Sequence, residues 1–225
     1  MDTRAPLIGW LLCALALPAA APLARAQQSD DLREARSKGS ATAAVTLYIM
    51  SDFECPFCGD FARTTFPIIE REYVATGKMR VVFVNMPLAS HRNAEPAAEV
   101  AMCAARQNKF WRMHDLLFRH QSEWADLAEP GPFLLAFGDS VGADRAALTS
   151  CLETAATRPL VKADYDGSLR TGAHATPSFY IEGGLMSGDQ PIDVFRPIFD
   201  SIIRVKTQHP APAREETTSS ESPRS

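Results

Sequence analysis

Two cysteines, Cys55 and Cys58, have the spacing that lets two thiols form a disulfide across one turn of chain. The run Val45-Thr-Leu-Tyr-Ile-Met50 before them predicts a buried strand, and residues 59–74 after them predict a helix. This order places Cys55 at a helix N-terminus, where unpaired N–H groups and the helix dipole favour thiolate over thiol. The pattern indicates a redox disulfide, although a structural disulfide or half of a zinc site has the same spacing.

A second feature lies at the start of a short strand predicted over Ser178-Phe-Tyr-Ile181, which ends at a Gly-Gly turn. A proline that opens a strand usually marks a bulge, an edge or a cis peptide bond, and Pro177 has that position. Taken with the Cys-x-x-Cys helix, Thr176-Pro177 resembles the cis-proline loop that faces the disulfide in thioredoxin-fold proteins.

The resemblance extends to the DsbA-like thiol–disulfide oxidoreductases. It is carried by Ser51-Asp-Phe-Glu-Cys-Pro-Phe-Cys58 and by Cys103-Ala-Ala-Arg-Gln-Asn-Lys-Phe-Trp-Arg-Met-His-Asp-Leu-Leu-Phe118, and it covers roughly residues 40–205. It implies an α/β thioredoxin fold with an inserted all-helical subdomain. It also implies that Cys55 is the exposed, attacking sulfur and Cys58 the resolving one, and that Thr176 and Pro177 bind the extended substrate backbone. No dissociable cofactor is expected.

The chain departs from this family at two positions. Relatives often carry a buried acid six residues before the first cysteine, for proton transfer to the second, and this chain has Ile49 there. Asp52 and Glu54 are the nearby acids, and we expect them in a more exposed loop. Strongly oxidising relatives have a histidine where this chain has Phe57, so we expect a less stabilised thiolate and a weaker oxidant.

Three further residues are candidates for tuning the site. Pro56 and Phe57 form the dipeptide between the cysteines, and His174 lies three residues before the strand-opening proline, from where it could add positive charge near the thiolate. His91 is a candidate for holding a loop near the site, with a capping or packing role equally open. His114 falls in an amphipathic aromatic pattern and is predicted to be a hydrogen-bonded helix residue rather than a ligand.

Cys103 and Cys151 are natural disulfide partners once the other pair has formed. Such a bridge would stabilise the fold by up to about 4 kcal/mol in the chain-entropy model. Two buried free thiols are an open alternative. A four-cysteine zinc site is disfavoured because only one close-spaced cysteine pair exists, and we predict no metal site.

The N-terminus has the pattern of a secretory signal over residues 1–26. Arg4 precedes an apolar run from Leu7 to Leu17, and Ala24-Arg-Ala26 fits the small-x-small cleavage rule. The alternative is an uncleaved membrane anchor. Cleavage would remove Cys13 and leave an even number of cysteines, which suits an exported, disulfide-bearing protein. The net charge of −4 gives no indication of nucleic-acid binding.

The predicted organisation is a flexible segment over 27–41, a domain over 42–205, and a disordered tail over 206–225. Within the domain, strands are predicted at Met79–Asn85 and in a hairpin formed by residues 178–181 and the run beginning Leu185-Met186. Helical patterns fill residues 91–172, and a closing helix is expected over 192–205. Periodicity predicts these helices, and the resemblance implies that they are inserted between the two halves of a thioredoxin frame.

The predicted function is an exported, periplasmic or otherwise extracytoplasmic, thiol–disulfide oxidoreductase that acts on client proteins with thiols. Family resemblance alone implies a membrane redox partner of the DsbB or VKOR type. One alternative is a disulfide reductase or isomerase. DsbC-type isomerases add an N-terminal dimerisation domain, and few residues precede the first strand here. The other alternative is a non-catalytic thioredoxin-fold binding module or chaperone.

Overall fold

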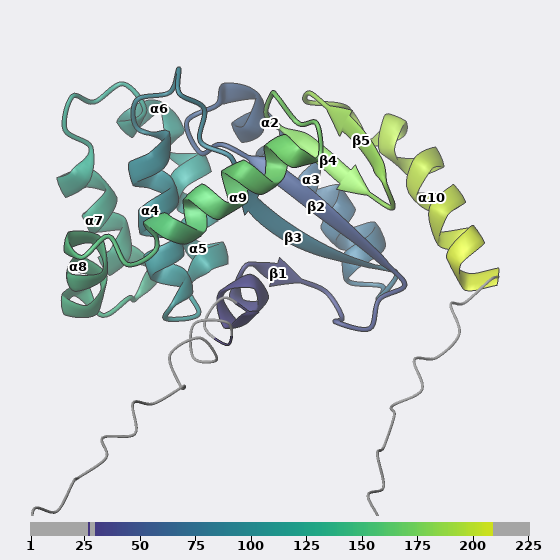
Figure 1. The fold of residues 1–225 in the computed structure, drawn as a ribbon, viewed down its shortest axis with the longest axis horizontal. Coiled ribbons are helices and arrows are strands. Elements are labelled where there is room, and N and C mark those ends of the chain that lie inside the picture. Colours follow the sequence, from purple (N-terminus) through teal and green to yellow (C-terminus); the bar gives the residue numbers. More distant parts are fainter. Residues whose placement is uncertain (1–26, 28–29, 209–225) are drawn as a thin grey trace, which may run out of the picture.

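The computed structural model describes residue 27 and residues 30–208 of the 225-residue chain. A five-stranded mixed sheet forms its centre, in the order β1-β3-β2-β4-β5 (Figure 1). Its strands are β1 (Ser37–Lys38), β2 (Val45–Ser51), β3 (Met79–Asn85), β4 (Ser178–Ile181) and β5 (Gly184–Ser187). The central strand β2 runs parallel to β3 and antiparallel to β4. The predicted strands and hairpin are therefore confirmed.

The sheet is covered on both faces because successive side chains of a strand point to opposite sides. On one face, Leu47 and Ile49 of β2 pack in an apolar cluster with residues of α2 (Pro56–Thr64), α3 (Phe66–Ile69) and α10 (Ile192–Gln208). On the other face, Met50 belongs to a smaller cluster against which Tyr165 of α9 packs. A π turn, Glu70–Val74, continues α3.

The insertion between β3 and β4 is entirely helical in its regular elements. It comprises α4 (Ala94–Ala105), α5 (Phe110–Arg119), α6 (Gln121–Trp124), α7 (Gly131–Val141), α8 (Arg145–Glu153) and α9 (Arg158–Arg170). A second apolar core joins these helices to the cysteine loop, since Phe53, Cys55 and Cys58 belong to the same cluster as α4 and α5 residues. The predicted α/β class with a helical insertion is confirmed.

The expectation of a flexible segment over 27–41 is wrong for most of its length. Residues 30–35 are helical, and β1 pairs antiparallel with β3. Leu32 is buried in the core, and the guanidinium of Arg36 pairs with the carboxylate of Asp164 on α9. Few apolar residues mark this segment, so its order depends on partners that are distant in the sequence.

The C-terminal boundary is also corrected, because α10 extends to Gln208 rather than ending at residue 205. The predicted signal over residues 1–26 and the tail from residue 209 onward lie outside the described residues. Within the described part, no helix has the length and apolar character needed to cross a membrane.

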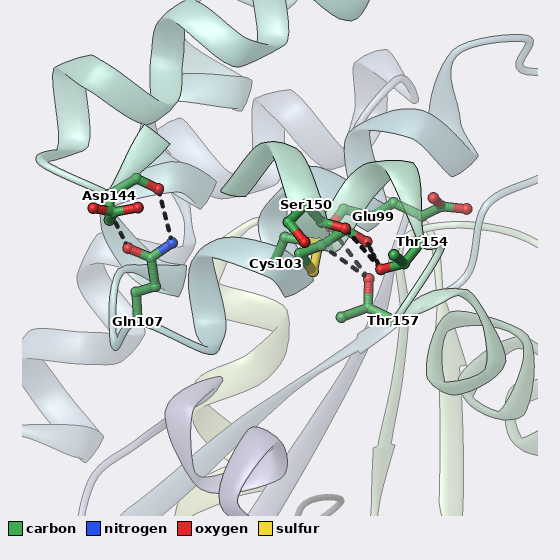
Figure 2. The surroundings of a disulfide bond; sticks show 8 residues. Glu99, Cys103, Gln107, Asp144, Ser150, Thr154 and Thr157 are labelled. Atoms are coloured by element: carbon green, nitrogen blue, oxygen red, sulfur yellow. Dashed lines mark hydrogen bonds between the residues drawn. A yellow bond between two sulfur atoms is a disulfide. The ribbon is translucent and has the colours of Figure 1, made fainter. Parts of the chain in front are cut away.

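A disulfide joins Cys103 of α4 to Cys151 of α8, with their Cα atoms 5.9 Å apart. Figure 2 shows it beside the Thr157 hydroxyl, which lies 3.6 Å from the Cys103 sulfur. A second link joins the turn after α4 to the start of α8, where the Gln107 side chain accepts a hydrogen bond from the N–H of Asp144 at 2.7 Å and donates one to its carbonyl oxygen at 3.3 Å. Asp144 also caps α8 by accepting a hydrogen bond from the N–H of Ala147.

Candidate active site

Cys55 and Cys58 lie at the N-terminal end of α2, where the sequence predicted a helix start. Cys55 is the extended N-cap residue and Pro56 occupies the first helical position, where a missing N–H does no harm. Both cysteines are free thiols in this structure. Cys55 was expected to be the exposed sulfur, but it retains only 4% of its accessible surface, against 0% for Cys58. Only Cys55 therefore offers any surface to a reaction partner.

The pKa values of the two thiols are shifted in opposite directions. A hydrogen bond from the Cys58 thiol is the largest cause that lowers the pKa of Cys55, and burial opposes it. The Thr176 side chain and the backbone N–H groups of Cys58 and Phe57 lower it further, to about 6. Burial is the main cause that raises the pKa of Cys58 well above its ordinary value. At neutral pH the pair therefore holds a thiolate at Cys55 and a thiol at Cys58.

Thr176 and Pro177 close the site from the start of β4. The peptide bond between them is cis, and the Cys55 sulfur lies 3.4 Å from the Thr176 carbonyl oxygen. The Thr176 hydroxyl is buried and has no hydrogen-bond partner among the described residues. It nevertheless lies close enough to Cys55 to lower the pKa of that thiol.

The side chains of the three tuning candidates lie on the surface rather than around the thiols. Pro56 is exposed, and Phe57 is 61% exposed, which leaves an apolar ring on the surface beside the cysteines. His174 is exposed on the loop before Thr176 and makes no hydrogen bond to either thiol within the described residues. Its proposed charge effect on the thiolate has no contact to support it.

Asp52 is the site residue that the sequence analysis misplaced. The expectation of an exposed loop is wrong, because this carboxylate is fully buried. It accepts hydrogen bonds from the N–H groups of Glu54 and Leu88, both at 2.8 Å, and lies 2.7 Å from Nδ1 of His91. Its own N–H lies 3.5 Å from the Cys58 sulfur. The available signal was its position, directly after a buried strand.

The helical insertion also holds the cysteine loop. The side-chain amide of Gln121 on α6 donates hydrogen bonds to the carbonyl oxygens of Phe53, at 2.7 Å, and Cys55, at 2.9 Å. Glu54, only half-buried, accepts a hydrogen bond from the N–H of Asn93 just before α4. The loop is therefore clamped by groups that lie 39 or more residues away in sequence.

Within the described residues, no cluster of three or more histidine, cysteine, aspartate or glutamate side chains has an arrangement that could hold a metal ion. The pair Cys103 and Cys151 lies in the insertion and is already bridged. The four cysteines of the described part thus form two separate pairs, one of free thiols at the start of α2 and one joining two helices.

Comparisons with known proteins point to one fold. A family model described as thioredoxin matches residues 32–201. The crystal structure of oxidised BdbD from Bacillus subtilis superimposes with a TM-score of 0.69 at 21% identity, covering 75% of this chain and 92% of that one. This structural likeness concerns the fold.

Two curated relatives are similar in sequence. A "probable disulfide bond formation protein D" of Bacillus anthracis is 25% identical over 68% of this chain and 72% of its own length. A Na(+)/H(+) antiporter, NhaA 3 of Salinispora tropica, is 31% identical over 69% of this chain. The chain spans only 23% of that antiporter's length.

Proposed function

The chain belongs to the thioredoxin family, and from this premise we propose that it is an exported thiol–disulfide oxidoreductase that forms or exchanges disulfides in client proteins through Cys55 and Cys58. The observation that carries the proposal is the pair of thiols beside the Thr176-Pro177 loop, with the pKa lowered at Cys55 and raised at Cys58. A lowered pKa makes Cys55 both a nucleophile and a good leaving group. A raised pKa keeps Cys58 protonated until it is needed.

In the oxidising direction, a client thiolate attacks the Cys55 sulfur of a Cys55–Cys58 disulfide. The bond between the two sulfurs breaks, Cys58 leaves and takes up a proton, and a mixed disulfide joins Cys55 to the client. A second client thiolate then attacks the client sulfur, which releases Cys55 as a thiolate and leaves a disulfide in the client. In the reducing direction, Cys55 attacks a client disulfide and Cys58 resolves the intermediate.

Thr176 and Pro177 are proposed to bind the client backbone during this exchange. The Thr176 carbonyl oxygen lies beside the Cys55 sulfur, so an extended client segment that donates a hydrogen bond there would bring its own sulfur close. The exposed ring of Phe57 and the neighbouring Pro56 add an apolar contact surface. Recognition of this kind favours unfolded or extended clients over folded ones.

Export is part of the proposal. The signal pattern over residues 1–26 predicts it, and the Cys103–Cys151 disulfide supports it, because such bonds persist in oxidising compartments. A membrane redox partner of the DsbB or VKOR type would then reoxidise or reduce the cysteine pair. An uncleaved N-terminal anchor is the alternative to a free periplasmic protein.

The preferred direction follows from the stability of the reduced pair. The pKa of about 6 at Cys55 lies between the values of about 7 for thioredoxin and about 3.5 for the most oxidising DsbA. We therefore expect a moderate oxidant, and a reductase or isomerase role is the closest alternative. Equilibration of the Cys55–Cys58 pair with glutathione buffers distinguishes the two roles. A pair that stays oxidised even at high concentrations of reduced glutathione would favour the reductase.

An activity test separates an enzyme from a binding module. The mature protein should oxidise a reduced model client and exchange disulfides with glutathione, and Cys55→Ser should do neither. The Cys103→Ala/Cys151→Ala variant is the matched control, since it removes two cysteines outside the site and should keep the activity. The proposal would be contradicted if Cys55→Ser kept both reactions or if the unmodified protein showed neither.

A further inference from the structure

Cys58 must gain and lose a proton in every cycle, but its side chain is not exposed to solvent. Its sulfur is fully buried, and burial raises its pKa well above the ordinary value. Position 49, where an acid would serve this transfer in relatives, holds an isoleucine. If the proposed function is correct, another group must carry the proton.

A small cavity of about 10 Å³ lies against Cys58. Ile49 forms part of its apolar wall, and its polar lining comes from Cys58, Ser51 and His114. A single buried water needs roughly 10–15 Å³ of such space and two to four polar partners. The cavity therefore has the size and the polar groups to hold one water between the thiol and the imidazole.

His114 projects from α5 into a cage of aromatic rings. The ring centroids of Phe118, Trp111 and Phe83 lie 4.9, 5.0 and 5.4 Å from the imidazole centroid. Its Nδ1 lies 2.9 Å from the Asp115 carboxylate. Burial is the main cause that lowers the pKa of His114, so the ring is neutral at neutral pH. With Nδ1 donating its proton to Asp115, Nε2 keeps a free lone pair.

The imidazole also lines a second space, which opens to solvent. This groove of about 320 Å³ lies between α2, α3, the π turn and α5, and Asp115 lines it together with His114. The charged groups around the imidazole are Lys38 of β1, Arg63 of α2, Glu70 of the π turn, and Asp115 and Arg119 of α5. The elements α3 and β3 contact it through the apolar rings of Phe66 and Phe83. His114 is the one titratable side chain that lines both spaces.

We propose that His114 relays the proton of Cys58 between the small cavity and the solvent-facing groove. When Cys58 resolves a mixed disulfide, its proton passes to Nε2 of His114 through one water in the cavity, as its sulfur bonds to Cys55 and the client leaves as a thiolate. The imidazolium then loses a proton to solvent on the Asp115 side. In the oxidising direction, the same path returns a proton to Cys58 as it leaves Cys55.

Asp52 is the other buried titratable group near Cys58, and its bonding disfavours it for this role. Its carboxylate already accepts hydrogen bonds from Glu54 and Leu88 and pairs with His91. It meets Cys58 through its backbone N–H rather than through its carboxylate. That carboxylate does not line the cavity, whereas His114 does.

The test follows the two steps of a single turnover between the reduced protein and oxidised glutathione. Acid quenching and mass spectrometry separate formation of the Cys55–glutathione mixed disulfide from its resolution by Cys58. In His114→Phe, resolution should slow by about 10²-fold or more at neutral pH, in line with the loss of a general base, and should then rise in proportion to hydroxide. The first step should keep its rate.

Phe118→Leu is the matched packing control. Phe118 lines the same cavity and groove and packs against the imidazole, but it carries no proton. Resolution in this variant should retain the pH profile of the unmodified protein. Equal slowing of resolution in both variants, or an unchanged rate in a folded His114→Phe, would overturn the relay.

The unmodified protein supplies a test that does not depend on folding of a variant. Its resolution rate should fall as pH drops through the lowered pKa of His114, below the ordinary histidine value of about 6.5. A rate simply proportional to hydroxide would overturn the relay. Failure to form any mixed disulfide at Cys55 would instead refute the proposed function itself.

Discussion

The carboxylate of Asp52 lies 2.7 Å from Nδ1 of His91, and this pair joins the cysteine loop to the loop that follows β3. The same carboxylate accepts the N–H of Leu88, and the N–H of Asp52 approaches the Cys58 sulfur. One buried residue thus contacts the resolving cysteine through its backbone and a partly exposed histidine through its side chain. A titrating group on the surface therefore has a structural connection to the redox pair.

This pair should make stability depend on pH in a defined sense. Burial of the ring lowers the pKa of His91, but the hydrogen bond and charge of Asp52 outweigh burial and raise it overall. A raised folded-state pKa gives a stabilisation that is complete below the unfolded value of about 6.5 and is lost as pH rises through the folded value. His91→Gln should therefore destabilise the protein more below about pH 6.5 than well above it. Urea unfolding of both proteins over this range measures the difference, and a constant difference would contradict it.

The roles of the two cysteines predict different defects. Cys55→Ser should abolish exchange, because the accessible thiolate is lost. Cys58→Ser should form mixed disulfides that accumulate, because the resolving thiol is lost. Non-reducing electrophoresis and mass spectrometry of each reduced variant after reaction with an oxidised client provide the measurement. Full turnover by Cys58→Ser would reverse the assignment.

Phe57→His should lower the pKa of Cys55 below its value of about 6 and raise the reduction potential. A histidine there can donate to the thiolate, whereas the phenyl ring cannot. Stabilising the thiolate by one pKa unit is about 1.4 kcal/mol, or roughly 30 mV for this two-electron couple. Thiolate absorbance against pH and glutathione equilibria measure both quantities, with Phe57→Leu as the control for lost aromatic contact.

Thr176→Val should shift the same pKa in the opposite direction. The Thr176 side chain is one of the groups that lower the pKa of Cys55, and valine keeps its shape without the hydroxyl. The change also removes a buried hydroxyl that has no complete hydrogen bond to the described residues, so stability should change little or rise slightly. Alkylation rates of the reduced protein against pH report the shift. A thiolate that titrates as before would show that this hydroxyl has no influence.

Removing the second disulfide should affect stability rather than chemistry. Cys103→Ala/Cys151→Ala opens a loop spanning a separation of 48 residues, which lowers the free energy of unfolding by up to about 4 kcal/mol. Both sulfurs are buried, so the alanine pair also leaves a small void. Urea unfolding and the glutathione exchange rate measure the two effects separately. An exchange rate that falls together with the free energy of unfolding would show that the bridge supports the site.

The sequence by itself determined the elements that local pattern controls. Strand β2 and strand β3 appear as continuous apolar runs, and the proline before β4 and the Gly-Gly turn after it delimit the hairpin. The placement of Cys55 at a helix start follows from the same local order. Family resemblance supplied the insertion of the helices, which periodicity alone does not reveal.

Only the tertiary structure decided which groups surround the thiols. Asp52 is polar and follows a strand, which reads locally as a loop, yet partners 36 and 39 residues away bury it. Residues 30–38 lack an apolar pattern, and their order depends on contacts with β3 and with Asp164, 128 residues beyond Arg36. His114 shares a cavity with Cys58 because α5 packs over α2. Burial and long-range pairing depend on the folded chain as a whole, so a local pattern cannot encode them.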